Sequence, residues 1–222
     1  AILPSIAGQW LSPLLKRFVA DHPEVRVQVM AEDSRVVHRL VATGDVDFAI
    51  SSLYETDASI DFTPLLRDRF GLLCPAGHRH SRSRGPLSWD EIGDEPVIGN
   101  VMHRLLVDTP VWKHVEHPRI HVSNLPTLLT LVRDGFGVTP IPALACPSGD
   151  ASLAFVPLRG PVLQRTIGLM TRSGRTLLPA ADAMVALIHE HLRHAAWQSG
   201  TFRRMKGMID PVRGARKSAA TV

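Results

Sequence analysis

The chain has 222 residues, of which 45% are hydrophobic and 21% charged, a composition typical of a soluble globular protein with one large or two small hydrophobic cores. No run of eighteen apolar residues occurs and the N-terminus lacks the pattern of a secretory signal, so we expect a cytoplasmic protein with no membrane partner. The net charge is +4, but residues 201–222 alone contribute +5, which leaves −1 on residues 1–200 and excludes an extended nucleic-acid-binding surface there.

Helix and strand patterns alternate in the first fifty residues. Apolar residues at helical spacing predict a helix around 10–19, strict alternation predicts a half-buried strand at 25–30 ("VRVQVM"), and a buried strand follows at 46–51 ("VDFAIS"). Between the strands we expect a helix at 34–43, with Asp33 or Ser34 as N-cap and Gly44 at its end. Such alternation is typical of a parallel sheet with crossover helices.

A second set of elements follows a strand at 70–74 and a polar loop at 79–88. The patterns predict helices at 88–92, 104–115 and 125–135, strands at 96–100, 119–123, 137–142, 153–158 and 165–172, and a long helix at 179–197. We therefore expect two lobes, with lobe I formed by 1–76 plus 166–200 and lobe II by 77–165. The basic tail 201–222 has no apolar period and is expected to be disordered.

The stretch "LVRDGFGVTPIP" joins a helix to a strand. Gly135 can take a positive φ to end the helix, and Gly137 allows a tight turn into the strand. Pro140 and Pro142 cannot donate to a sheet ladder, so we expect this strand to be short or at an edge.

Cysteine and histidine usage gives little sign of chemistry. Cys74 and Cys146 lie in apolar surroundings typical of buried thiols, although a redox pair is the alternative. The histidine-rich stretches contain His114, His117, His121, His189, His191 and His194. Their spacing does not match a common metal motif, and enzymatic motifs are absent, so we expect no metal, no cofactor and no catalytic residues.

The order and spacing of six segments resemble the effector-binding domain of the LysR-type transcriptional regulators. The segments are "PSIAGQWLSPLLKRFVADHPEVRVQV", "LVATGDVDFAIS", "LCPAGHRHS", "LLTLVRDGFGVTPIP", "FVPL" and "RTIGLMTRSGRTLLPAADAMVALI". The resemblance covers about residues 1–197. It implies an α/β, two-lobed, type II periplasmic-binding-protein-like fold, in which we expect each lobe to be a mixed, mostly parallel sheet flanked by helices.

This resemblance also implies a function. A small-molecule effector binds in the interlobe cleft and shifts lobe and oligomer geometry to control transcription, while a winged helix-turn-helix that these residues do not include contacts DNA. A homodimer or tetramer is expected, with the first helix and the helix at 125–133 as candidate surfaces, although their leucines are equally well explained as core. The alternative function is a solute-binding protein of a transporter, which shares the fold.

By similarity to the family, residues at the starts of predicted helices line the effector cleft. They are Ser5, Ile6, Ser34, Asn100, Val101, Met102, His103, Ser123, Asn124 and Leu125. Helix N-termini favour anions, which indicates a small carboxylic acid.

Each of these residues also has a purely structural interpretation. Ser5 and Ser34 are equally well explained as helix caps, and Asn124 better so. His103 can supply a cation or lie in solvent, and Met102 is more often a packing residue.

Overall fold

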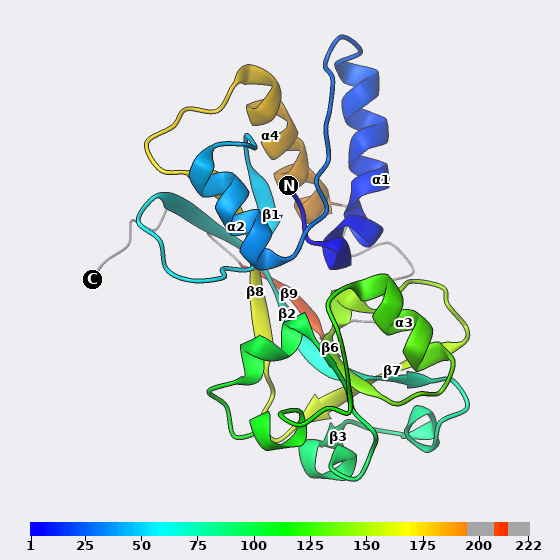
Figure 1. The fold of residues 1–222 in the computed structure, drawn as a ribbon. Coiled ribbons are helices and arrows are strands. Elements are labelled where there is room, and N and C mark those ends of the chain that lie inside the picture. Colours follow the sequence, from blue (N-terminus) through cyan, green and yellow to red (C-terminus); the bar gives the residue numbers. More distant parts are fainter. Residues whose placement is uncertain (195–206, 213–222) are drawn as a thin grey trace. The chain divides into compact units, whose positions relative to one another are not determined.

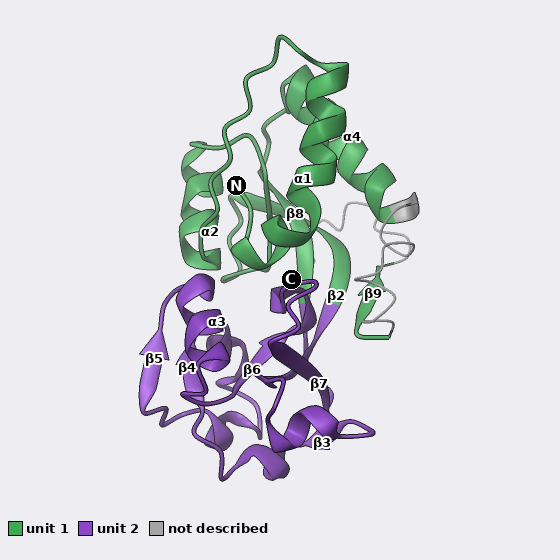
Figure 2. Ribbon diagram, turned by 90° about the vertical axis from the view of Figure 1, so that its right-hand side faces the viewer, with its two compact units in different colours: residues 1–67, 166–222 green, residues 68–165 purple. Residues whose placement is uncertain are grey.

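The computed structural model describes residues 1–194 and 207–212 (Figure 1). It divides into two compact units, one of Ala1–Arg67 with Thr166–Val222 and one of Asp68–Arg165 (Figure 2). The first crossing lies at 67/68 rather than at the predicted 76/77. The crossing falls inside the continuous 16-residue strand β2 (Ile60–Pro75), so no loop marks it in the sequence. Among the described residues, no helix is long and apolar enough to cross a membrane.

The described residues of unit 1 contain three α-helices: α1 (Pro4–Asp21), α2 (Ser34–Thr43) and α4 (Pro179–His194). The prediction of α2 is confirmed to the residue, with Asp33 as the N-cap and Gly44 in the left-handed conformation at its end. Helices α1 and α4 pack together, and Arg17 Nη2 lies 2.8 Å from Glu190 Oε2 across their surface.

The strands of unit 1 pair with the first half of β2 or with β8 (Gln164–Arg172). Strand β1 (Ala49–Ser51) runs antiparallel to β8, and β8 in turn adjoins β2. In the tail, β9 (Ile209–Pro211) pairs with β2 and buries Ile209, so this part of the tail is a strand and not the disordered segment that was predicted (Figure 1). Residues 201–206 and 213–222 lie outside the described residues.

The predicted strand at 25–30 is wrong. The segment is extended but forms no sheet ladder, and Val27 and Val29 are 41% and 38% exposed. Its end is held by Ile2, whose N–H donates to Met30 O (2.9 Å) and whose C=O accepts from Glu32 N (3.2 Å). Alternation predicts an extended backbone, but a strand also needs a neighbour along its whole length.

Unit 2 has one α-helix, α3 (Leu125–Arg133), among its described residues. Its other helical turns are the short 3₁₀ segments η1 (Arg79–Arg82), η2 (Trp89–Ile92), η3 (Val101–Leu106), η4 (Trp112–His114) and η5 (Ala143–Ala145). The single helix predicted at 104–115 is wrong, because Pro110 cannot continue a helical ladder and η3 and η4 lie on either side of it.

The sheets of the molecule are mostly antiparallel, which corrects the predicted mostly parallel arrangement. In unit 2, β2 runs antiparallel to β6 (Thr139–Pro142) and to β7 (Leu153–Arg159). The parallel ladders are short: β3 (Leu87–Ser88) with β7, and β4 (Ile98–Asn100) with β5 (Ile120–Val122). The long strand β2 is the pairing partner of β6 and β7. Pairing between segments so far apart in the chain cannot be predicted from short local patterns. The four-residue length of β6 confirms that its prolines keep it short.

The two glycines before β6 act differently from each other. Gly135 has a φ of 79°, as predicted for a residue that ends a helix. Gly137 does not make a left-handed turn, but a Cβ there would lie 2.0 Å from Pro96 O. Its role is therefore close packing against the segment before β4, which corrects the predicted tight turn.

Each unit has its own hydrophobic core. In unit 1, α1 buries Ile6, Trp10 and Phe18, and in unit 2 the core gathers around Phe70 and Trp89. Both cysteines lie in unit 2 as buried thiols, and burial raises the pKa of each to about 11. A thiol with that pKa is a poor nucleophile, which favours the structural interpretation of Cys74 and Cys146 over the redox one.

Candidate functional site

Three extended segments of unit 1 run parallel to one another. Ile2 forms parallel bridges with Ala31 on one side and Ile50 on the other, and Leu3 N donates to Ile50 O (3.1 Å). The first segment of the chain therefore lies in the centre, the second on one side and the third on the other. In this order, the chain connections leave the first strand toward opposite sides. In α/β folds, ligands bind at the point where connections diverge in this way.

The carboxyl ends of these segments bring together the polar groups of unit 1. Helix α1 begins two residues after Ile2, α2 begins three residues after Ala31, and Ser51 and Ser52 directly follow Ile50. Because parallel segments end at one edge, both helix N-termini lie at that edge. Free N–H groups and the helix dipole make such an edge favourable for an anion.

Ser5 and Ile6 lie in the first turn of α1 but are more enclosed than we predicted. The helix begins at Pro4 with Leu3 as N-cap, so Ser5 is not a cap residue. Its side chain is buried, and that of Ile6 is fully buried in the core of unit 1. The N–H of Ile6 already donates to Leu3 O (2.9 Å), so Ile6 contributes to the position of the turn.

Ser34 is the first residue of α2, and the cap role belongs to its neighbour. Asp33 Oδ1 accepts hydrogen bonds from Arg35 N (2.8 Å) and Val36 N (3.1 Å). The cap interpretation therefore does not account for Ser34, whose side chain is half-buried at the carboxyl-end edge. Ser34 is the clearest candidate for an effector contact in unit 1.

Unit 2 repeats the arrangement of unit 1. Strand β4 lies in the centre, β5 runs parallel on one side, and Val97, just before β4, forms a parallel bridge with Val138 on the other. The carboxyl ends lead into η3, α3 and β6 respectively. As in unit 1, the central segment comes first in the sequence and is followed by the segments on its two sides. Each unit therefore has an edge of the same design.

A buried hydrogen-bond network lies at the edge of unit 2. Asn100 caps η3 by accepting from Met102 N (2.9 Å), and its Nδ2 donates to Thr139 Oγ1 (2.9 Å). Thr139 Oγ1 donates to Ile98 O (2.7 Å), and His103 Nε2 lies 3.0 Å from Pro140 O. These contacts fix the residues after β4 against the start of β6.

His103 is neither a cation nor a solvated side chain, which corrects both predictions made for it. The side chain is buried, and burial lowers the pKa of His103 to about 4, partly offset by the bond to Pro140 O. His103 Nε2 lies 3.0 Å from the acceptor Pro140 O and 2.9 Å from the donor Asn100 Nδ2, so the tautomer of the neutral ring decides which of the two bonds is made. His103 therefore positions η3 and gives an anionic effector no positive charge.

The remaining predicted residues of unit 2 lie around the same edge. Val101 and Met102 are half-buried in η3, which leaves part of each side chain accessible. Asn124 caps α3 by accepting from Thr127 N (2.9 Å), which confirms its cap role. Ser123 and Leu125 flank it directly after β5, with Ser123 exposed and Leu125 half-buried.

Three polar residues at these edges were missed by sequence analysis. Ser51 is buried at the end of β1, Ser52 is buried directly after it, and Thr139 is fully buried at the start of β6. The signal for the serines was available, because two hydroxyls directly follow a buried strand. Thr139 had no such signal, since its bond to Asn100 joins residues far apart in the chain.

Comparison with protein families adds to this geometry. The family model described as the LysR substrate binding domain matches residues 1–193. An uncharacterized HTH-type transcriptional regulator, YbhD of Escherichia coli, is 30% identical over 196 residues, which cover 85% of this chain and 61% of that regulator. The chain thus spans less than two thirds of that relative's length.

Solved structures share the fold. The effector binding domain of QuiR in complex with shikimate has a TM-score of 0.74 at 16% identity, covering 87% of this chain and 95% of that one. The CcmR regulatory domain of Synechocystis PCC6803 in complex with 2-PG has a TM-score of 0.76 at 14% identity, covering 87% and 96%. These similarities confirm the predicted fold of LysR effector-binding domains, which is periplasmic-binding-protein-like.

Proposed function

Because the chain belongs to the LysR substrate binding domain family, we propose that it senses a small-molecule effector for a LysR-type transcriptional regulator. Effector binding favours one arrangement of the domain over another, and a difference of about 1–3 kcal/mol between arrangements is enough for regulation. Another part of the regulator contacts DNA. Because the regulator acts on transcription, we expect it to work in the cytoplasm. The proposal involves no catalysis, in keeping with relatives that are transcriptional regulators.

The observation that carries the proposal is the edge of unit 1 where α1 and α2 both begin. Two helix N-termini and the hydroxyls of Ser34, Ser51 and Ser52 are grouped there by three parallel segments. The dipoles of the two helices suit an anionic or polar group of a ligand at this edge. Asp33 Oδ1 already accepts from Arg35 N and Val36 N, and Ser51 Oγ donates to Ser52 O, so the Ser34 hydroxyl is the side chain proposed for the ligand. Within unit 2, the edge of the same design carries Val101, Met102 and Ser123.

The chemical class that fits these donors is a small carboxylic acid. A carboxylate accepts hydrogen bonds from backbone N–H groups and hydroxyls without needing a cationic side chain. His103 is neutral, so backbone donors and helix dipoles would supply the complementary charge. Half-buried apolar side chains such as Val101 suit the hydrocarbon part of such a molecule.

We further propose that the domain assembles with a second copy of itself. An apolar groove in unit 1 is lined by α1, the extended segment 25–30 and α4, and it includes the exposed Val27 and Val29. Apolar surface of this kind is typical of a protein interface. Light scattering measures the copy number directly, and a monomer at micromolar concentration would contradict this part of the proposal.

A thermal-shift screen of the purified chain tests effector sensing. It should include shikimate and 2-PG, the compounds bound in similar structures, together with other small carboxylic acids, amino acids and aromatic metabolites. A ligand at about 100 times its Kd adds roughly 2.7 kcal/mol, which raises the Tm by roughly 5–10 °C for a chain of this size. A folded chain that none of these compounds stabilises would count against the proposed ligand class.

Ser34→Glu then tests where the ligand binds. A carboxylate at the start of α2 suits the helix dipole, so we expect the variant to fold, but it would repel an anionic effector. The matched control is Ser34→Gln, which has the same shape and no charge. We expect calorimetric affinity to fall at least tenfold more in Ser34→Glu than in Ser34→Gln, and equal affinities would place the ligand away from α2.

A further inference from the structure

A cluster of titratable side chains in unit 2 lies away from the residues assigned to the effector. His78 and His80 come from the turn after β2 and from η1, and Glu95 comes from the segment that leads into β4. One ligand atom from each of the three lies within 4.8 Å of the other two. The group is not evident from the sequence, because Glu95 is fifteen residues from His80.

Two distances within the cluster are close to those between neighbouring ligands of one metal ion, with each histidine near a different oxygen of Glu95. His78 Nε2 lies 3.3 Å from Glu95 Oε2, and His80 Nε2 lies 3.0 Å from Glu95 Oε1. Ligand atoms in a tetrahedral zinc site, each about 2.0–2.1 Å from the ion, lie roughly 3.3 Å from one another. Little movement is needed to place one ion against all three side chains.

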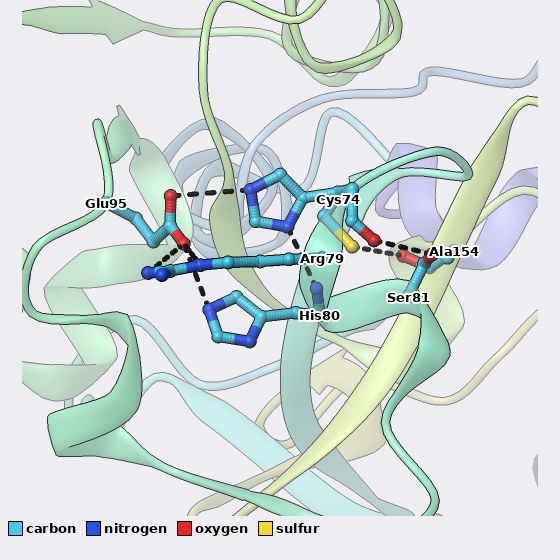
Figure 3. Close-up of polar contacts among 7 residues, drawn as sticks. Cys74, Arg79, His80, Ser81, Glu95 and Ala154 are labelled. Atoms are coloured by element: carbon cyan, nitrogen blue, oxygen red, sulfur yellow. Dashed lines mark hydrogen bonds and ion pairs between the residues drawn. The ribbon is translucent and has the colours of Figure 1, made fainter.

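His80 is the second observation that points to a ligand. Its Nε2 is buried and makes no hydrogen bond with any described residue, although Glu95 Oε1 is within reach (Figure 3). The 3.0 Å between His80 Nε2 and Glu95 Oε1 is short enough for a hydrogen bond, so it is the angle that rules the bond out: the N–H does not point at the oxygen. A buried polar atom left in this way is costly in a folded protein.

The backbone around the cluster is already fixed. Ser81 Oγ donates to Ala76 O (2.6 Å) and to His78 O (2.7 Å), and Glu95 N donates to Ile92 O (3.1 Å). The Glu95 and His80 side chains are only 9% and 12% exposed, so their rotamers are restricted. Ordered ligands lose little entropy on binding an ion, which favours a site over a chance grouping.

Arg79 holds the carboxylate that the ion would need. Its Nε and Nη2 each lie 2.7 Å from Glu95 Oε1, the same oxygen that His80 Nε2 approaches (Figure 3). The Arg79 side chain is 65% exposed, so it can turn into solvent at small cost. Cys74 does not join the set, since its thiol is directed to Ala154 O (3.8 Å).

We propose that His78, His80 and Glu95 bind a divalent transition-metal ion, with zinc as the expected metal, and that Arg79 competes with it for Glu95. Two imidazoles and one carboxylate are a common zinc ligand set that leaves the fourth position to water. Coordination through Nε2 of His78 puts the ring proton on its Nδ1. Nδ1 then no longer accepts the long 3.3 Å hydrogen bond from His80 N. The proposal does not depend on the effector site.

Zinc titration of the metal-free full chain tests the site. We expect one saturable site by calorimetry, weakened about 10–100-fold or more in His80→Ala and in Glu95→Gln. The matched control is His117→Ala, a histidine whose side chain is 88% exposed. Absence of saturable binding, or equal binding by wild type and both ligand variants, would overturn the proposal.

Arg79→Gln separates a metal site from a structural ion-pair cluster. Removing the competing guanidinium should tighten zinc binding several-fold, whereas the exposed Arg82→Gln in the same η1 should leave it unchanged. This outcome does not depend on whether the ligand variants fold. If Arg79→Gln leaves zinc affinity unchanged or weakens it, the assignment of the ion to Glu95 is wrong.

Discussion

At the residue scale, His103 shows how burial decides a role that residue type leaves open. The sequence places a histidine after a strand of the second lobe, where it can bind an anion. The structure places its ring under β6, 3.0 Å from Pro140 O and 2.9 Å from Asn100 Nδ2. Burial keeps the ring neutral, so its function is to hold η3 in place.

The first prediction concerns pH and His103. Its pKa is lowered from 6.5 to about 4 in the folded chain, so the unfolded state binds the proton more readily. Stability contributed by the neutral ring is therefore complete above about pH 6.5 and is lost as the pH falls toward 4. A shift of this size corresponds to about 3 kcal/mol, as an order of magnitude.

Urea unfolding at a series of pH values measures this effect. We expect the free energy of unfolding of wild type to decline between pH 6.5 and 4 more steeply than that of His103→Leu, whose side chain cannot titrate. Parallel pH profiles for the two proteins would show that His103 is accessible and charged in the folded state.

At the element scale, sequence patterns succeeded where the deciding interactions are local. Helix α2 was predicted to the residue, because its cap at Asp33 and its end at Gly44 are set within the helix itself. The predictions of a strand at 25–30 and of a helix at 104–115 failed for different reasons. The first lacks a neighbouring strand along its length, and the second contains a proline whose effect apolar spacing masks.

Long-range pairing was also beyond the sequence. Strand β2 was predicted only at 70–74, because its first half lacks a clear alternation, yet it runs from Ile60 to Pro75. The mostly antiparallel sheets follow from this one strand. The positions of Ser5, Ser34 and Asn100 could be predicted from helix starts, whereas the burial of Ser5 and the bond between Asn100 and Thr139 depend on packing between distant segments.

The second prediction concerns the N-cap of α2. Asp33→Ala removes the acceptor for two backbone N–H groups and should lower the free energy of unfolding by about 1 kcal/mol, within a range of roughly 0.5–2. Asp33→Ser keeps an acceptor and is the control. If urea unfolding gives Asp33→Ala the same free energy of unfolding as wild type, solvent satisfies those two N–H groups equally well.

At the scale of the whole molecule, the two units share one design. In each, the first extended segment is central, the second and third flank it in parallel, and a helix or helical turn begins after the first and after the second. Ile2 takes in unit 1 the place that β4 takes in unit 2. This repetition explains why effector residues were predicted in two separate parts of the sequence.

The central claim is that an effector contacts the carboxyl-end edges of these segments, and hydrogen exchange with and without ligand tests it most directly. For any compound that stabilises the chain, we predict slower amide exchange in the first turns of α1 and α2 in unit 1, and in residues 101–103 and 124–127 of unit 2. Slower exchange confined to other segments, with these turns unchanged, would contradict the account.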